Sequence, residues 1–358
     1  MLSVADMSSI REVAELAGVS PTTVSMVLNN KSEANISPAT CKRVFAAADE
    51  IGYRPNPYAR ALVGSKAPLV KLVYRPHEMY IGNLKGATLL TQLRETGREI
   101  MVTDSLSTDS GIVDTLLWGQ PEAVVFQYVS RADTLAEAYT ALHDAGVHCI
   151  VADCWELPDP ELPCDAVTVD RIGGVSLGME HLIDRGHRHI GLVLSGAQFG
   201  RREGYDQTLD RHDIPHRYVF SFDPAAGAPD RTRESAVALG ARGAAEELLR
   251  ENPQISALIC GSDMIALGAM GAATAVQRRI PDDLALVGMH GEPWTELLPV
   301  PLTTVAEPVA EICSLATDIL CARLSGDDRP WVRERVAPHL LMRESSEEDF
   351  RSCVEASP

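Results

Sequence analysis

Residues 9–30, SIREVAELAGVSPTTVSMVLNN, contain two short helical patterns separated by a glycine. The apolar positions of the first pattern follow the i, i+3, i+4, i+7 spacing of an amphipathic helix and are Ile10, Val13, Ala14 and Ala17. Gly18 follows at the position where a helix end tolerates positive φ, and Ser20–Pro21 is an N-cap followed by proline at the first helical position. Val24, Val27 and Leu28 form the apolar face of the second pattern. The stretch predicts a helix-turn-helix, the unit that places its second helix in the DNA major groove.

The polar face of the second helix favours DNA contact over the alternative, a helical hairpin inside an ordinary domain. It carries hydroxyls and a thioether at Thr22, Thr23, Ser25 and Met26, whereas a solvated helix face is usually rich in Lys and Glu. Ser37–Pro38 begins a third helical pattern whose apolar stripe is Val44, Ala47, Ala48 and Ile51. Gly52 is the expected C-terminal cap.

The segment 53–66, YRPNPYARALVGSK, predicts one more short helix from Pro57 to about Val63. A helix of this length is well below the roughly 12–15 residues that are stable alone in water, so we expect it to form only when packed against a partner. In a DNA-bound dimer, Leu62 could insert between base steps in the minor groove. The alternative is an ordinary interdomain linker.

These motifs carry a family resemblance. The run VAELAGVSPTTVSMVLN, followed by ISPATCKRV, IGYRPN and ARALVG, resembles the head and hinge of the lactose-repressor/galactose-repressor (LacI/GalR) family. The resemblance implies an N-terminal all-α helix-turn-helix head with a hinge helix, then an α/β effector domain of two Rossmann-like, periplasmic-binding-protein-like subdomains. It also implies a homodimeric repressor of a catabolic operon that binds a palindromic double-stranded DNA operator.

The resemblance also implies which residues contact DNA. Base contacts fall to Pro21, Thr22 and Met26, and backbone contacts to Ser20, Thr23, Ser25 and Asn29, with Asn56, Ala59 and Leu62 in the hinge. The family usually has arginine in place of Met26. Arginine can pair with guanine through two hydrogen bonds, whereas methionine packs on a thymine methyl, so we predict an A·T-shifted or relaxed preference at that base.

Charge is divided unevenly along the 358 residues, whose net charge is −18. Residues 1–66 carry seven Lys/Arg and six Asp/Glu, and the remaining residues carry 25 and 44. The excess of acidic residues therefore belongs to the predicted α/β effector domain. The head is nearly neutral, which implies modest non-specific DNA affinity and dependence on dimerisation.

The eight cysteines form no C-x-x-C pair, so we expect no zinc site and no metal, and reduced cysteines that fill the core. Neither a secretory signal nor an apolar run long enough to span a membrane is present. These observations predict a cytoplasmic protein, and the family resemblance implies a bacterial one associated with the nucleoid. No cofactor is expected.

From residue 68 onward, short β-rich runs alternate with amphipathic helices, which predicts parallel sheets covered on both faces. The predicted strands are 70–74, 99–103, 123–127, 149–152, 166–169, 189–194, 218–222, 257–260 and 284–289. The predicted helices are 82–96, 135–145, 173–185, 204–212, 233–251 and 263–278. This is more strands than one sheet comfortably holds, which favours two Rossmann-like subdomains with a cleft between them.

The expected organisation is a disordered N-terminus (1–8), the head (9–55), the hinge and linker (56–67), the effector and dimerisation domain (68–345) and a disordered acidic tail (346–358). The resemblance implies discontinuous subdomains: an N-subdomain of 68–165 plus 295–326, and a C-subdomain of 166–294 plus 327–345. Tetramers are unsupported, because the tail lacks apolar heptads.

Ligands of such domains bind at the carboxyl ends of strands, in the cleft. Matching to the family places Arg201, in the setting RREGY, on the effector-binding arginine, and it places Tyr80, Asp153, Ser262 and His290 on other cleft positions. For each, the alternative is a salt bridge or helix cap at a strand end.

Two departures from the family concern the effector. His290 stands where the family commonly has aspartate, and Arg171 where it commonly has asparagine. We therefore hypothesise an effector that is a sugar-derived acid or phosphate rather than a neutral sugar. Whether it acts as an inducer or a corepressor is left open.

Two other classes of protein compete with a regulator. An enzyme lacks support, because G-x-S-x-G, P-loop and H-E-x-x-H motifs are absent and no catalytic residue is predicted. A solute-binding protein would account for the predicted effector domain but not for the helix-turn-helix head.

Overall fold

The computed structural model describes residues 9–28, 36–53, 68–74, 80–103, 112–129, 135–196, 198, 200–224 and 232–347. The chain divides into two compact units, Met1–Pro68 and Leu69–Pro358. The predicted hinge helix lies outside the described residues, and so do Asn29, Asn56, Ala59 and Leu62 and the segments 1–8 and 348–358.

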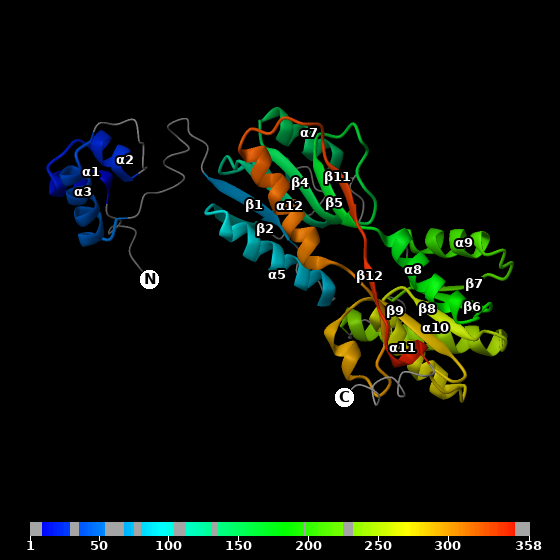
Figure 1. The fold of residues 1–358 in the computed structure, drawn as a ribbon. Helices are drawn as coiled ribbons and strands as arrows, with labels where there is room; N and C mark the ends of the chain where they lie inside the picture. The colour runs from blue at the N-terminus through cyan, green and yellow to red at the C-terminus, as the bar shows by residue number, and fades with distance from the viewer. Residues whose placement is uncertain are drawn as a thin grey trace, which may run out of the picture. The chain divides into compact units, whose positions relative to one another are not determined.

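The first unit contains the three predicted head helices: α1 (Ile10–Ala17), α2 (Pro21–Leu28) and α3 (Pro38–Glu50) (Figure 1). Their apolar stripes meet in one small core made of Val13, Ala14, Ala17, Val24, Val27, Val44, Ala47 and Ala48. The small alanines allow the helix axes to approach closely, and half-buried Ile10, Leu28 and Ile51 flank the core.

Local caps fix the turn between α1 and α2. Gly18 has φ 63°, and its N–H donates to the carbonyls of Ala14 and Glu15, which ends α1. The Oγ atom of Ser20 accepts a hydrogen bond from the Thr23 N–H at 3.1 Å, which begins α2. Sequence inspection did not identify the cap of α1, where Ser9 and Glu12 form a reciprocal capping box.

The second unit contains two six-stranded sheets. The N-subdomain sheet has the order β11-β5-β4-β3-β1-β2 and is parallel throughout. Its strands are β1 (Leu69–Val73), β2 (Glu99–Thr103), β3 (Ala123–Val129), β4 (His148–Cys154), β5 (Asp165–Val169) and β11 (Arg333–Val336). Strands such as β1 and β5 are buried at every position, because helices cover both faces of the sheet.

The C-subdomain sheet has the order β12-β10-β9-β8-β6-β7, with only β12 antiparallel to its neighbour. Its strands are β6 (Ile190–Ser195), β7 (Tyr218–Phe222), β8 (Ala257–Cys260), β9 (Ala285–His290), β10 (Thr303–Ala306) and β12 (His339–Leu341). Helices α8 (Arg171–Asp184) and α9 (Arg201–Arg211) cover one face, and α10 (Arg233–Glu251) and α11 (Asp263–Ala275) cover the other.

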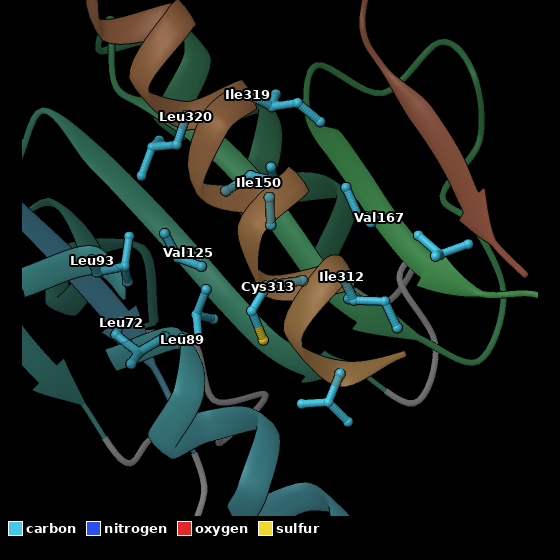
Figure 2. Packing of buried hydrophobic residues seen from close by; sticks show 14 of the residues in the cluster. Leu72, Leu89, Leu93, Val125, Ile150, Val167, Ile312, Cys313, Ile319 and Leu320 are labelled. Atoms are coloured by element: carbon cyan, nitrogen blue, oxygen red, sulfur yellow. The ribbon is translucent and has the colours of Figure 1, made fainter. Parts of the chain in front are cut away.

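One face of the N-subdomain sheet is covered by α5 (Tyr80–Glu95) and α12 (Val309–Leu324), and the other by α6 (Ile112–Leu117) and α7 (Ala136–Asp144). Figure 2 shows α12 lying across the sheet, with Ile312, Cys313 and Leu320 facing the strands. Because α12 follows β10 of the other sheet, this packing ties the two subdomains together.

The predicted subdomain boundaries were wrong. β5, which was predicted in the C-subdomain, pairs in the N-subdomain sheet. β10, which was predicted in the N-subdomain, pairs in the C-subdomain sheet. β11 was also predicted in the C-subdomain, but it lies beside β5 in the N-subdomain sheet. The chain therefore crosses between the sheets after β5, β10 and β11. The boundaries were implied by the family resemblance, because the alternation of strands and helices predicts parallel sheets without saying which strands are neighbours.

All the predicted strands of the second unit are present, and their ends differ from the predicted ends by at most two residues. The predicted helices of this unit are also present, and their ends differ by at most three residues. The strands β10, β11 and β12 and the helices α6 and α12 were missed. β11 reads RERV and β12 has three residues, so neither shows the apolar run by which the other strands were identified.

The predicted disordered tail begins too early. Ser346 is buried, and its Oγ atom lies 2.7 Å from Nε2 of His181 and 2.7 Å from Oγ1 of Thr303. Glu347 pairs with Arg185. Ser346 is held in place because it satisfies the buried polar side chains of His181 and Thr303, and Glu347 adds a half-exposed ion pair.

Two helical glycines give a matched test of how closely α10 and α11 pack. A Cβ atom on Gly268 would lie 2.3 Å from the Ala238 carbonyl oxygen, whereas one on Gly243 would meet nothing within 4 Å. We expect Gly268→Ala to lower the free energy of unfolding by about 1–3 kcal/mol through overpacking. We expect Gly243→Ala to leave it unchanged or raise it by up to ~1 kcal/mol. Urea denaturation measures both, and equal effects would contradict the close approach.

Candidate functional site

The outer face of α2 is polar but uncharged. Pro21, Thr22 and Met26 are exposed, with Met26 at 37%, and Thr23 and Ser25 are half-buried. Thr22 and Met26 are spaced i, i+4 and therefore share one face. Ser20 and Thr23 also serve the fold, because their hydroxyl oxygens lie 2.9 Å apart at the helix start. The structure thus exposes the side chains that the sequence predicted for base contact.

In the second unit, the predicted effector site is built from the ends of strands and the first turns of helices. Asp153 belongs to β4 and His290 ends β9. Arg171 and Arg201 are the first residues of α8 and α9. Asp153 (φ 76°) and His290 (φ 110°) both have positive φ, which is unusual for residues other than glycine and is commonly found at functional sites.

Asp153 is the centre of a buried ion-pair network. Its Oδ2 atom lies 2.6 Å from Nζ of Lys85, and its Oδ1 atom lies 2.8 Å from Nη2 of Arg171. Thr168 donates its hydroxyl to the same Oδ1 at 3.0 Å. Burial would raise the pKa of Asp153, but Arg171 and Lys85 outweigh burial and hold the pKa well below its usual range.

Glu307, which follows β10, is the second carboxylate of the network and pairs with Lys85. Burial would raise its pKa, yet Lys85, His290 and Arg171 lower it to about 2. Lys85 itself is buried, and these two carboxylates raise its pKa against the effect of burial. The network therefore joins α5 and β4 of the N-subdomain to the two crossings that follow β5 and β10.

Arg201 and His290 form a second group beside this network. Arg201 is 2% exposed, and its Nη2 atom lies 3.0 Å from Nε2 of His290. A guanidinium has only donors, so Nε2 must be the acceptor and the imidazole is neutral, with its proton on Nδ1. Burial, followed by the charges of Arg201, Lys85 and Arg171, lowers the pKa of His290 to about 3, although Glu307 opposes the shift.

Trp155, just beyond β4, lies against both arginines. The guanidinium carbons of Arg171 and Arg201 are 4.9 and 5.1 Å from the centroid of its ring. These are cation–π distances, and they hold the two cations next to one aromatic surface.

The remaining predicted effector residues are placed differently. Ser262 is buried and its Oγ atom accepts from the Ile265 N–H at 3.2 Å, so it is the N-cap of α11. Tyr80 is exposed at the first turn of α5, where its backbone N–H donates to Glu234 of α10. The structure brings Asp153, Arg201 and His290 together but does not group Tyr80 and Ser262 with them.

Sequence inspection missed Lys85 and Glu307. Lys85 lies among apolar residues of α5, and a lysine on a buried helix face signals a paired charge. Among the described residues, no group of three or more His, Cys, Asp or Glu residues is arranged to hold a metal ion. In the same part of the chain, every helix is too short or too polar to span a bilayer.

A helix-turn-helix head joined to a two-sheet α/β domain defines a DNA-binding protein with a domain of the small-molecule-binding type. The model of the lacI family of bacterial regulatory proteins matches residues 9–56, and that of a periplasmic binding protein-like domain matches residues 179–346. The HTH-type transcriptional regulator CelR of Thermobifida fusca is 30% identical over 350 residues, covering 94% of this chain and 98% of that protein.

Solved structures agree on the fold. The Lac repressor dimer bound to operator and the anti-inducer ONPF superposes with a TM-score of 0.78 at 23% identity, covering 95% of this chain and 99% of that one. The CelR–cellobiose complex superposes with a TM-score of 0.63 at 25% identity, covering 95% and 100%. The chain belongs to the lacI family of bacterial regulatory proteins and is a helix-turn-helix transcriptional regulator.

The ion-pair network gives a stability prediction. Lys85→Met would leave Glu307 and Asp153 with one fewer cation in a buried site, and we expect it to lower the free energy of unfolding by about 3–5 kcal/mol. Arg202→Met removes an ion pair of 2.6 Å with Asp206 on the exposed face of α9, and we expect a loss within about 1 kcal/mol. Urea denaturation of both variants is the measurement. A Lys85→Met loss no larger than that of Arg202→Met would contradict the network.

Proposed function

We propose that this regulator is a repressor that binds a palindromic operator as a homodimer and responds to a small molecule bound in the cleft of its α/β domain. The observation that carries the proposal is the exposed, uncharged face of α2 in a capped helix-turn-helix. The similar structures named above are a repressor dimer on operator DNA and a regulator with cellobiose. They support a protein in which the head binds DNA and the α/β domain binds a small molecule.

In this proposal, Pro21, Thr22 and Met26 contact base edges, while Ser20, Thr23 and Ser25 contact the DNA backbone. Asn29 would join the backbone contacts, and Asn56, Ala59 and Leu62 would act in the hinge. The exposure of Thr22 and Met26 on one face supports the assignment, because direct base contact requires side chains that reach beyond the helix surface.

The proposed effector site is centred on Arg201 and His290, with Asp153 behind them; Tyr80 and Ser262 are secondary candidates. Differential binding of the effector to two arrangements of the subdomains would alter DNA affinity. The protein would act through binding alone, without a catalytic site or cofactor, in the bacterial cytoplasm at the nucleoid.

A binding selection from random double-stranded DNA with the full chain tests the proposal. We expect enrichment of two inverted half-sites, as a dimer requires. A variant with Thr22→Ala and Met26→Ala should lose at least about tenfold in affinity for the selected site, because truncating base contacts costs ~1–3 kcal/mol each. Ala46→Ser, on the exposed face of α3, is the matched control and should bind normally. Failure to enrich any sequence would contradict the proposal.

Met26 should also set sequence preference. We expect Met26→Arg to shift one base pair in each half-site toward G·C, because arginine can donate two hydrogen bonds to guanine. Selections with the wild type and the variant, run in parallel, measure the shift. Identical selected sites would show that residue 26 does not contact a base.

A further inference from the structure

The carboxylates of the buried ion-pair network are already engaged by the protein. Asp153 accepts hydrogen bonds from Thr168, Arg171 and Lys85, and Glu307 pairs with Lys85. Recognition of a neutral sugar relies on acceptors for its hydroxyl groups, and Asp153, which already accepts from three side chains, has little capacity left for them. Asp153 is therefore poorly placed to recognise a ligand through the ligand's hydroxyl donors.

The Arg201–His290 pair has the opposite character. Arg201 is an enclosed cation whose side chain contacts a neutral imidazole nitrogen and the sulfur of Met289. The side chain of His290 is 10% exposed, and its Nδ1 atom is buried with no hydrogen-bond partner in the described part of the chain. A buried donor without an acceptor costs free energy, which an incoming acceptor would recover. The pair thus presents donors that suit an anion.

The charges that face His290 come from several elements. Arg201 of α9, Lys85 of α5 and Arg171 of α8 are cations, and Glu307 after β10 and Asp153 of β4 are the carboxylates of the network. Glu292 lies on the loop that follows β9, with Oε1 3.9 Å from Nδ1 of His290. Trp294 donates to the other oxygen of Glu292, and burial raises the pKa of this glutamic acid to about 7.

Resting on the proposed function, we infer that the effector carries a carboxylate or phosphate group that binds Arg201, and that Nε2 of His290 takes up one proton from solvent on binding. In the free protein, Nη2 of Arg201 donates to the lone pair of Nε2. When Arg201 turns its donor to the anion, that lone pair becomes available to a proton. The resulting imidazolium then faces both the anion and Glu307, whose Oε1 is 3.9 Å from Nε2.

The pH dependence follows from this exchange. His290 is neutral in the free protein because its pKa is lowered to about 3. A bound anion raises the pKa, so the complex holds a proton that the free protein lacks, and affinity rises as pH falls through the pKa of the complex. If the anion restores the ordinary value of about 6.5, affinity at pH 6 exceeds that at pH 8 about fourfold, with about 0.8 proton taken up at pH 6.

Titration calorimetry on the full chain tests the inference. The anionic probes are gluconate, galacturonate, glucose 6-phosphate and inorganic phosphate, and the neutral controls are glucose and galactose. We expect at least one anion to bind about tenfold or more tighter than its neutral counterpart. Proton uptake is measured in buffers of different ionisation enthalpy, after subtraction of the probe's own ionisation, which for the phosphates has a pKa of about 6. Equal or tighter neutral-sugar binding, or no binding of any anion at millimolar concentration, would overturn the inference.

Matched variants locate the effect. Arg201→Gln should weaken anion binding at least about tenfold, whereas Arg202→Gln, at the next and exposed position, should not. His290→Gln should abolish proton uptake, and Glu292→Gln should retain it; the reverse result would assign the proton to Glu292 and overturn the role of His290. The wild-type proton uptake is a test that depends on no variant.

Operator binding in the same preparations separates the two proposals. Sequence-specific binding with failed anion recognition would reject only the effector class. Failure to bind any DNA sequence would reject the proposed function itself.

Discussion

Lys85 is held between Asp153 and Glu307 in the interior of the α/β domain, and Arg171 completes the set. Arg171 and Glu307 lie where the chain leaves β5 and β10 to cross between the two sheets, and Lys85 of α5 and Asp153 of β4 bind them there. Ionised groups are expensive to remove from water, and they persist in an interior only when they are paired and hydrogen-bonded. The arrangement therefore demands a fixed geometry at the crossings, which places the ends of β4 and β9 and the starts of α8 and α9.

That geometry has a consequence for recognition. A carboxylate that neutralises lysine and arginine has little capacity left to accept hydrogen bonds from a ligand. Asp153 thus supports the site that we propose for the effector, and Arg201 and His290 supply the hydrogen-bond donors of that proposed site. The unusual φ values of Asp153 and His290 show that the backbone is constrained at both positions.

The head depends on a different balance. Its core is built mainly from alanine and valine, and the polar contacts that shape it are short-range caps at Ser9, Ser20 and Ser37. Because α2 carries no charged residue, the DNA contacts that we propose for it would depend little on long-range electrostatics and more on fit to the base edges. A near-neutral head on an acidic domain is suited to a protein that binds DNA at selected sites only.

The sequence by itself determined the parts whose causes are local. The spacing of Val13, Ala14 and Ala17, the glycine at position 18 and the Ser20–Pro21 start are short-range signals, and the structure has the helix-turn-helix they predict. Most buried strands and long helices of the second unit were likewise predictable, since hydrophobic periodicity records burial, although β10 and α12 were missed. The grouping of Asp153, Arg201 and His290 was predicted from a family resemblance rather than from periodicity.

Only the tertiary structure decided which strands are neighbours. β5 and β10 look alike in sequence, yet they belong to different sheets. The sequence of β11 is polar and gives no strand signal, so only its pairing with β5 identifies it as a strand. Lys85 and Glu307 are 222 positions apart in the chain, so no local pattern could reveal their contact. Long-range pairing depends on how whole layers pack together, and that information is distributed over the chain rather than contained in any one segment.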